Sequence, residues 1–156
     1  MSLDSQSHSI CIFSEGQIRV PEGYQDNTVN VFVSSHENAP SFNISRDLLV
    51  EGETLPAYID RQLGQLEKHL SGWKLLAREA AELGQHVLSG EHVRASYLRD
   101  GRRIWQDQAV FSLDDHRVLI FSQSKAGKLD DADARLFALW LAGFSFPAQS
   151  GDAHHV

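Results

Sequence analysis

The chain has 156 residues, of which 42% are hydrophobic and 22% charged, and its formal net charge is −7 at pH 7. These values predict a single globular domain over residues 1–156, with an ordered core at about 9–146 and loose ends at about 1–8 and 147–156. Because the chain is acidic, it has no stripe of basic side chains to bind phosphates, and we expect no nucleic-acid partner. The same acidity disfavours adsorption to an anionic membrane surface.

The N-terminal region gives the expected location. Its first residues, MSLDSQSHS, have neither a basic start nor an apolar segment, so we expect no secretory signal. No apolar run approaches the roughly 18 residues of a membrane span. The lone Cys11 excludes an intrachain disulfide and a cysteine zinc cluster. Because Ile10 and Ile12 flank it, we interpret it as a buried strand residue rather than a reactive thiol. We therefore expect a cytoplasmic protein without stable membrane insertion.

The first half of the chain is predicted to contain strands. Residues 10–13 and 17–20 flank Glu15-Gly16, as the two arms of a hairpin do. Residues 28–34 and 41–45 alternate between two kinds of side chain, which is the pattern of strands with one covered face. The sequence therefore predicts four consecutive strands before the first helix.

Residues 54–69 are predicted to form that helix. Apolar residues recur at steps of three and four positions, at Leu55, Ile59, Leu63, Leu66 and Leu70. Thr54 is suited to cap the start, and Pro56 in the first turn costs no hydrogen bond. Gly72 is expected to stop the helix.

The second half repeats this order. Strands are predicted at 73–78, 93–99, 103–112 and 117–123, and Asp100-Gly101 marks a two-residue hairpin turn. A helix follows at about 130–143, where aspartates favour the N-terminus and an apolar face begins at Ala132. Four strands, a helix, four strands and a helix predict an α+β fold, in which a curved antiparallel sheet carries both helices on one face.

The strand pattern divides the sheet residues between two faces. The helix-covered face is expected to carry Val29, Val31, Val33, Phe42 and Ile44. The open face is expected to carry Thr28, Asn30, Phe32, Ser41, Asn43 and Ser45, with Ile104, Gln106, Gln108 and Val110 from the later hairpin. The last strand has apolar residues on both faces.

The open face is unusual because it has few charges. Solvated sheet faces usually carry lysine and glutamate in cross-strand pairs. A neutral face that mixes hydroxyls, amides and apolar side chains is typical of a surface that a partner covers. The alternative is that these are ordinary polar residues of an outward strand face, and both readings remain open.

Catalytic and metal motifs are absent from the sequence. The eight histidines fall in predicted turns, helix ends and chain ends, without HExxH spacing or a cysteine partner. His86 and His92, for example, flank a turn predicted at Ser89-Gly90. No GxSxG, GxxxxGK[ST] or GxGxxG motif is present. We therefore expect no metal, no cofactor, no catalytic residue and no enzymatic activity.

Three segments carry a resemblance to a known family. VPEGYQDNTVNVF, SFNISRD and GETLPAYIDRQLGQL resemble the DcrB-like fold and, within it, the effector-associated gene (Eag) chaperones of type VI secretion, over roughly residues 10–146. The resemblance implies a cytosolic chaperone that shields the hydrophobic N-terminal helices of PAAR-domain effectors. It also implies a homodimer, client binding on the concave sheet face, and indirect contact with the secretion spike during loading.

Strand phase and resemblance together predict the client-binding residues. These are Thr28, Asn30, Phe32, Ser41, Asn43, Ser45, Gln62, Ile104, Gln106 and Gln108. Gln62 is included because it lies between Ile59 and Leu66 on the sheet-facing side of the helix, although a boundary residue would look the same. Two other functions stay open, a generic DcrB-like binding module and a small-molecule carrier that uses the same face. A neighbouring gene for a PAAR effector would favour the chaperone.

Overall fold

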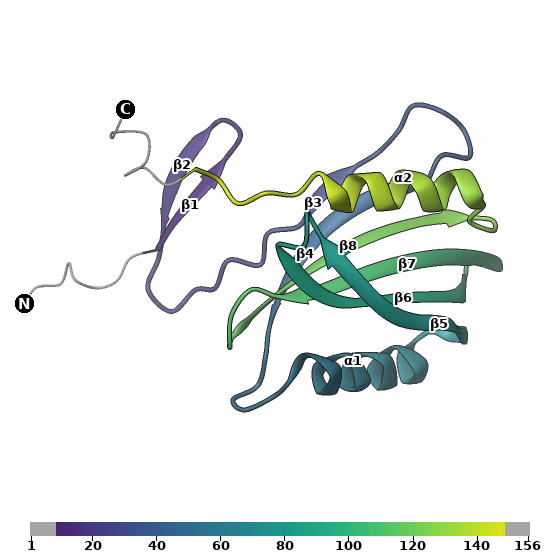
Figure 1. Cartoon of the computed structure of the whole chain (residues 1–156), viewed down its shortest axis with the longest axis horizontal. Helices are drawn as coiled ribbons and strands as arrows, with labels where there is room; N and C mark the ends of the chain where they lie inside the picture. The colour runs from purple at the N-terminus through teal and green to yellow at the C-terminus, as the bar shows by residue number, and fades with distance from the viewer. Residues whose placement is uncertain (1–8, 149–156) are drawn as a thin grey trace, which may run out of the picture.

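The computed structural model describes residues 9–148, which form an open sheet with a helix on each side and a separate hairpin (Figure 1). The elements in chain order are β1 (Ser9–Phe13), β2 (Gly16–Val20), β3 (Asn30–Phe32), β4 (Ser41–Leu48), α1 (Leu55–His69), β5 (Ser71–Leu83), β6 (Leu88–Arg99), β7 (Arg102–Ser112), β8 (Arg117–Ala126) and α2 (Asp131–Ala142). The predicted element order and the α+β class are confirmed.

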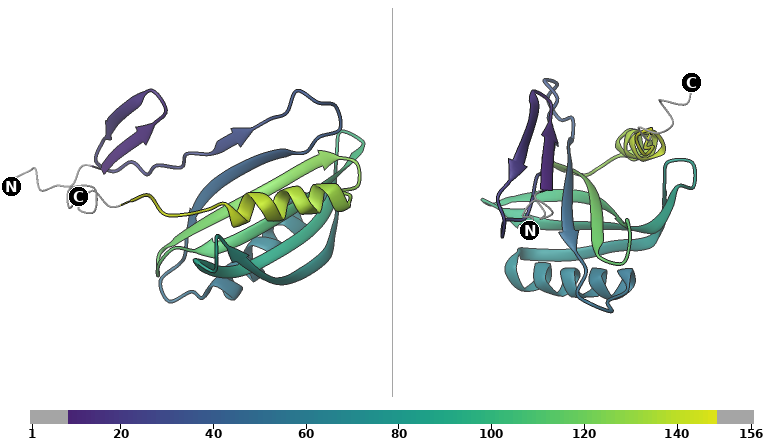
Figure 2. Two further views of the ribbon diagram at one scale, coloured as in Figure 1. Left: turned by 45° about the horizontal axis from the view of Figure 1, so that its top comes forward. Right: turned by 90° about the vertical axis from the view of Figure 1, so that its left-hand side faces the viewer.

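Six strands form the main sheet in the order β3-β4-β8-β7-β6-β5, and every neighbouring pair is antiparallel. The predicted Asp100-Gly101 turn joins β6 to β7, with φ of 52° and 78° at its two residues. Positive φ at both positions is what a two-residue hairpin turn of this kind requires. Strands β1 and β2 form a two-stranded sheet of their own, which lies apart from the main sheet (Figure 2).

The two helices lie on opposite faces of the sheet, so the prediction that both cover one face is wrong (Figures 1 and 2). In α1, Ile59 packs in one apolar cluster with Val110 of β7. In α2, Phe137 packs in a second cluster with Ala109, the preceding residue of the same strand. Consecutive strand residues point to opposite faces, and the two helices therefore cover opposite sides.

The helices lie on opposite faces because the central strands carry apolar residues on both of their sides. In β8, Val118 belongs to the α1 cluster, whereas Leu119 and Phe121 belong to the α2 cluster. Such continuous apolar runs are typical of strands that are covered on both faces. Two helices on one side would leave one of these apolar sets in water, at a cost of about 25 cal/mol per Å² of apolar surface.

Capping side chains mark the start of both helices, and the predicted N-cap Thr54 is confirmed. Thr54 is the N-cap of α1, and its side chain accepts a hydrogen bond from the amide of Ala57. Asp130 caps α2 and forms a reciprocal capping box with Asp133. The prediction that Gly72 stops α1 is wrong, because the helix ends at His69 with Leu70 as its C-cap. Gly72 lies within β5 at an irregular pairing, with a φ of 61°.

A buried carboxylate organises the α2 side of the sheet. Asp107 of β7 is fully buried and accepts hydrogen bonds from His92 Nε2 at 3.0 Å, Arg94 Nε at 2.8 Å and Gln123 Nε2 at 2.8 Å. Gln123 also donates to the main-chain carbonyl of Asp133 in α2. The network therefore fastens α2 to three strands. The turn predicted at Ser89-Gly90 is not found there, because both of these residues and His92 lie within β6.

This network predicts a loss of stability in acid. Burial by itself raises the pKa of Asp107, but the hydrogen bonds from His92, Arg94 and Gln123 outweigh it and lower that pKa to about 2, from an ordinary 3.8. The pKa of Asp107 is lower in the folded chain than in the unfolded chain. Ionised Asp107 therefore stabilises the fold fully above pH 4, and this stabilisation is lost as the pH falls through 2. It amounts to about 2 kcal/mol.

The measurement is urea unfolding of the wild type and Asp107→Asn between pH 6 and pH 2. We expect the wild type to be more stable at pH 6 and the difference to narrow as the pH approaches 2. Other carboxylates titrate in both proteins and cancel in the comparison. If the two proteins differ in free energy of unfolding by the same amount at every pH, ionised Asp107 is not the source of the stabilisation.

Candidate client-binding groove

The α1 side of the sheet is only partly covered, because α1 crosses it from one corner. Tyr58 at the start of α1 donates a 2.6 Å hydrogen bond to Asp47 at the end of β4. At the far end of the helix, the chain turns directly into β5 at Ser71, which pairs with Leu98 beside the β6–β7 hairpin. The first half of α1 therefore covers β8, β7 and β6 near Val118, and the opposite corner stays open.

The strand register brings polar residues together in this open corner. Antiparallel partners share a face, so the strand pairing forms rows of neighbours across β4, β8 and β7. The rows are Ser41, Ser124 and Gln106; Asn43, Ser122 and Gln108; and Ser45, Ile120 and Val110. The first two rows consist only of hydroxyls and amides.

We call this region the α1-face groove. It comprises Ser41, Asn43, Ser45, Gln62, Ile104, Gln106, Gln108, Ile120, Ser122 and Ser124. Two hollows lie within it. One of about 290 Å³ is lined by Ser41, Ile104 and Ser124, and one of about 100 Å³ lies between Gln62 of α1 and Gln108 of β7. The predicted placement of Gln62 toward the sheet is confirmed by this second hollow.

Seven of the ten predicted client-binding residues lie in the groove, and the predicted set lacks three groove residues of β8, Ile120, Ser122 and Ser124. Ser122 and Ser124 occupy the centre of the first two rows. Their pattern was available in the sequence, because FSQSKA continues the alternation of β8 beyond its apolar part. The predicted strand ended at Gln123, whereas β8 extends to Ala126.

The remaining three residues, Thr28, Asn30 and Phe32, do not line the groove, which corrects the predicted phase of β3. Asn30 pairs with Ile44 and Phe32 with Phe42, so both side chains point to the α2 side. The ring of Phe32 lies edge-on to Trp140 of α2, with centroids 6.3 Å apart. Thr28 precedes the strand, and its hydroxyl binds Asp26.

The alternate residues of β3 are correspondingly misassigned. Val31 pairs with Asn43 and therefore borders the groove, although it was expected in the core, and its exposed fraction is 63%. Val29 and Val33 are also exposed. The predicted phase of β3 is wrong because it assumes that valines face the covered side of the sheet. In this edge strand, the aromatic contact of Phe32 with α2 sets the phase instead.

Polar contacts fix the helix that forms the wall of the groove. Burial and the hydrogen bond to Asp47 both raise the pKa of Tyr58 above its ordinary range, so its hydroxyl stays a donor. Arg78 of β5 pairs with Asp60 of α1 and with Glu91 of β6. These contacts hold α1 at both its first turn and its second, and thereby place Gln62 beside the groove.

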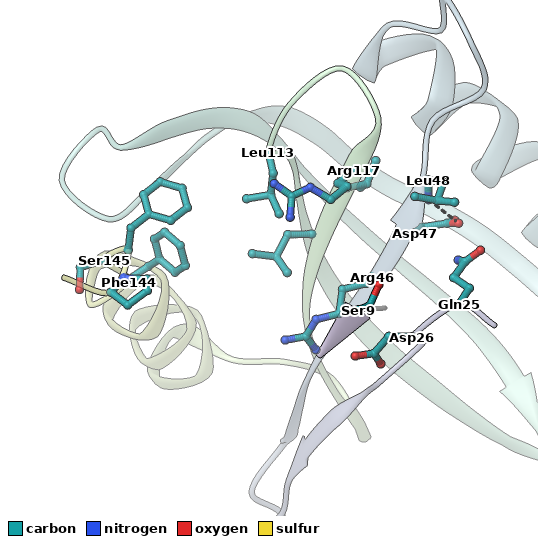
Figure 3. A pocket seen from close by; sticks show the side chains of 14 residues that line it. Ser9, Gln25, Asp26, Arg46, Asp47, Leu48, Leu113, Arg117, Phe144 and Ser145 are labelled. Atoms are coloured by element: carbon teal, nitrogen blue, oxygen red, sulfur yellow. Dashed lines mark hydrogen bonds between the residues drawn. The ribbon is translucent and has the colours of Figure 1, made fainter. Parts of the chain in front are cut away.

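A larger hollow lies outside the groove and has a different character. It measures about 560 Å³ and lies between the end of β4, the start of β8 and the segment after α2 (Figure 3). Arg46 and Arg117 line it together with Phe144. Both guanidinium groups are already engaged, Arg46 with the side chain of Asn30 and Arg117 with Asp114. It contains none of the groove residues.

The fold and the groove define an α+β protein with an open, neutral sheet face, and comparison with known proteins gives the family. The DcrB family model matches residues 15–143. The chain therefore belongs to the DcrB family. It is 36% identical over 76 residues to a protein of Pseudomonas aeruginosa PAO1 described as "Effector EagT6". That match covers 47% of this chain and 53% of the relative, so the chain spans about half the length of the curated relative it matches.

A solved structure shows the same fold. It is a protein of unknown function from Pseudomonas aeruginosa, PA94, described as a putative regulator, with a TM-score of 0.73 and 22% identity. The superposition covers 92% of this chain and 100% of that one. The expected DcrB-like fold is confirmed. In residues 9–148, neither helix has the length and apolar character needed to cross a membrane.

Proposed function

We propose that the protein is a cytosolic type VI secretion chaperone that acts by binding and not by catalysis. Its client is a PAAR-domain effector whose hydrophobic N-terminal helices it shields until the effector is loaded onto the spike. The observation that carries the proposal is the α1-face groove, in which neutral polar and apolar side chains are combined. The similarity to the Eag protein over 76 residues supports the type VI secretion context.

The groove has the chemistry that an apolar helix requires. Such a helix presents aliphatic side chains, together with occasional polar groups that need partners once water is excluded. The half-buried Ile120 offers apolar contact, while Ser41 and Gln106 offer hydrogen bonds. The three rows contain no charged residue, so a client helix is covered without burying an unpaired charge, which is costly.

The size of the sheet supports a homodimer. A membrane-spanning helix is about 30 Å long, and the six strands of the main sheet span about 29 Å at about 4.8 Å spacing. One sheet face therefore has room for one such helix, and two facing copies are needed to enclose several. The β1–β2 hairpin supports it independently. Its Ile12 is 78% exposed, and Phe13 and Ile18 are exposed as well. An isolated two-stranded hairpin is marginal in water, so a second copy is the natural cover for these side chains.

We therefore predict a dimeric mass in solution at micromolar concentration. Light scattering or sedimentation measures it, and Ile12→Asp combined with Ile18→Asp should shift the mass toward the monomer without unfolding the main sheet. The matched control is Leu139→Asp on the exposed side of α2, which should stay dimeric. A monomeric wild type, with or without client, would contradict this part of the proposal.

The function is tested by co-expression with the N-terminal segment of a PAAR effector. We expect the apolar segment to remain soluble and to co-purify with the chain. A small-molecule carrier would instead leave the segment insoluble and would retain a compound through purification. That result would replace the chaperone with the alternative function.

A further inference from the structure

The groove has a positively charged end, formed by two arginines of the β6–β7 hairpin. Arg99 and Arg102 are direct cross-strand partners on either side of the Asp100-Gly101 turn. Tyr97 pairs with Ile104 two positions further along the same strands. Because side chains alternate, Arg99 and Arg102 point to the same side of the sheet as Ile104, which is the side of the groove.

The arrangement of these arginines is electrostatically unfavourable in the free protein. Like charges directly opposite each other destabilise an antiparallel pair. No ion pair within residues 9–148 involves Arg99 or Arg102, although Arg61, Arg78, Arg94 and Arg117 each have a carboxylate partner. Asp100 of the same turn lines the hollow as well, but none of the ion pairs of residues 9–148 joins it to either arginine. Two arginines and one aspartate leave a local excess of one positive charge, in a chain of net charge −7.

This positive end is continuous with the groove. The 290 Å³ hollow is lined by the hairpin residues Arg99, Asp100 and Arg102 together with Ser41, Ile104 and Ser124. Lys125 also borders it, but its ammonium group is held by Asp133 at 2.6 Å on the other side of the sheet. Along β7, Arg102 precedes Gln106 by four residues, roughly 13 Å. A helix in the groove therefore has one end within reach of both arginines.

We propose that Arg99 and Arg102 bind an acidic side chain that flanks the apolar client helix, and thereby set the direction in which the helix lies in the groove. This rests on the proposed function. A carboxylate forms short, charge-assisted bonds with guanidinium groups, and it relieves the repulsion between the two arginines. The far corner of the same face is covered by α1, and Arg78 of β5 in that corner is already paired with Asp60 and Glu91. A client with an acidic flank is therefore favoured at the hairpin end.

The test uses a Leu/Ala helix of about 20 residues fused to a soluble carrier protein. Its end carries a flank of two aspartates, two asparagines or two lysines, and the dissociation constant of each fusion for the full chain is measured. We expect the Asp-flanked helix to bind about tenfold more tightly than the Asn-flanked helix, with the Lys-flanked helix the weakest. The preference should shrink as the salt concentration rises.

Variants of Arg99 and Arg102 test whether these two arginines cause the preference for the Asp-flanked helix. Arg99→Gln combined with Arg102→Gln should make the Asp- and Asn-flanked helices bind equally, and Arg99→Glu with Arg102→Glu should favour the Lys flank. The control Arg135→Gln, on the exposed side of α2, should keep the tenfold preference. Equal binding of Asp and Asn flanks by the wild type overturns the inference, as does a preference that survives the double glutamine variant.

The same measurements distinguish a failure of this inference from a failure of the proposed function. If the Asn-flanked helix binds the wild type, the groove is a client site whatever the flanks show. If no fusion binds, the proposed function fails together with the inference.

Discussion

Replacing Ser45 with arginine is expected to abolish binding of the apolar client helix while leaving the protein folded. Ser45 lies in the third row of the groove, beside Ile120, on a face that is uncovered in the free protein. A guanidinium group there meets an apolar helix without a counter-charge, at a cost of about 3 kcal/mol or more. That is a loss of at least about a hundredfold in affinity. Gln106→Glu should act in the same way from β7.

Both variants are compared with the wild type by co-purification and by titration of the client segment. Their circular dichroism and urea midpoints should match those of the wild type, since neither position lies in the α1 or the α2 apolar cluster. Arg46→Gln, one residue beyond Ser45 and on the opposite face, should bind normally. If Ser45→Arg and Gln106→Glu both retain the client, the binding surface lies elsewhere.

Ile44→Arg, one position before Ser45, is expected to unfold or severely destabilise the domain instead. Ile44 pairs with Phe121 and packs against the α2 cluster, so the new charge has no accessible partner in the core. Adding the lost apolar contacts to the penalty of burying a charge, we expect a loss of about 4 kcal/mol in the free energy of unfolding.

Urea unfolding measures this loss directly. The same substitution at adjacent positions thus separates a binding defect from a folding defect, because the only difference is the face to which the side chain points. A stable Ile44→Arg protein that has lost only its client would mean that the two faces have been exchanged in our assignment.

The sequence was sufficient where local rules decide the structure. Thr54 and Asp130 cap their helices because their side chains accept hydrogen bonds from amides of the first turn, which requires no knowledge of the tertiary fold. Asp100-Gly101 fixes the β6–β7 hairpin and hence places Gln106 and Gln108 on one face. Ser41, Asn43 and Ser45 share a face for the same reason, since strand alternation is a local property.

The sequence was insufficient where the outcome depends on which elements meet. Alternation states that Val31 and Phe32 point to opposite sides, but it does not say which side α2 covers. The contact between Phe32 and Trp140 decides this, and those residues are far apart in the chain. The network around Asp107 was missed likewise, because His92, Arg94 and Gln123 come together only through the pairing of three strands.

The central claim, that the α1-face groove holds the apolar client helix, is tested most directly by photo-crosslinking from β4. A photoreactive residue replaces Asn43, which lies in the groove, or Arg46, which points to the other side of the same strand. Each protein is co-expressed with the effector N-terminus and irradiated, and the crosslinked chain is identified by mass spectrometry. We expect client crosslinks from position 43 and none from position 46. Client crosslinks from position 46 alone would contradict the central claim.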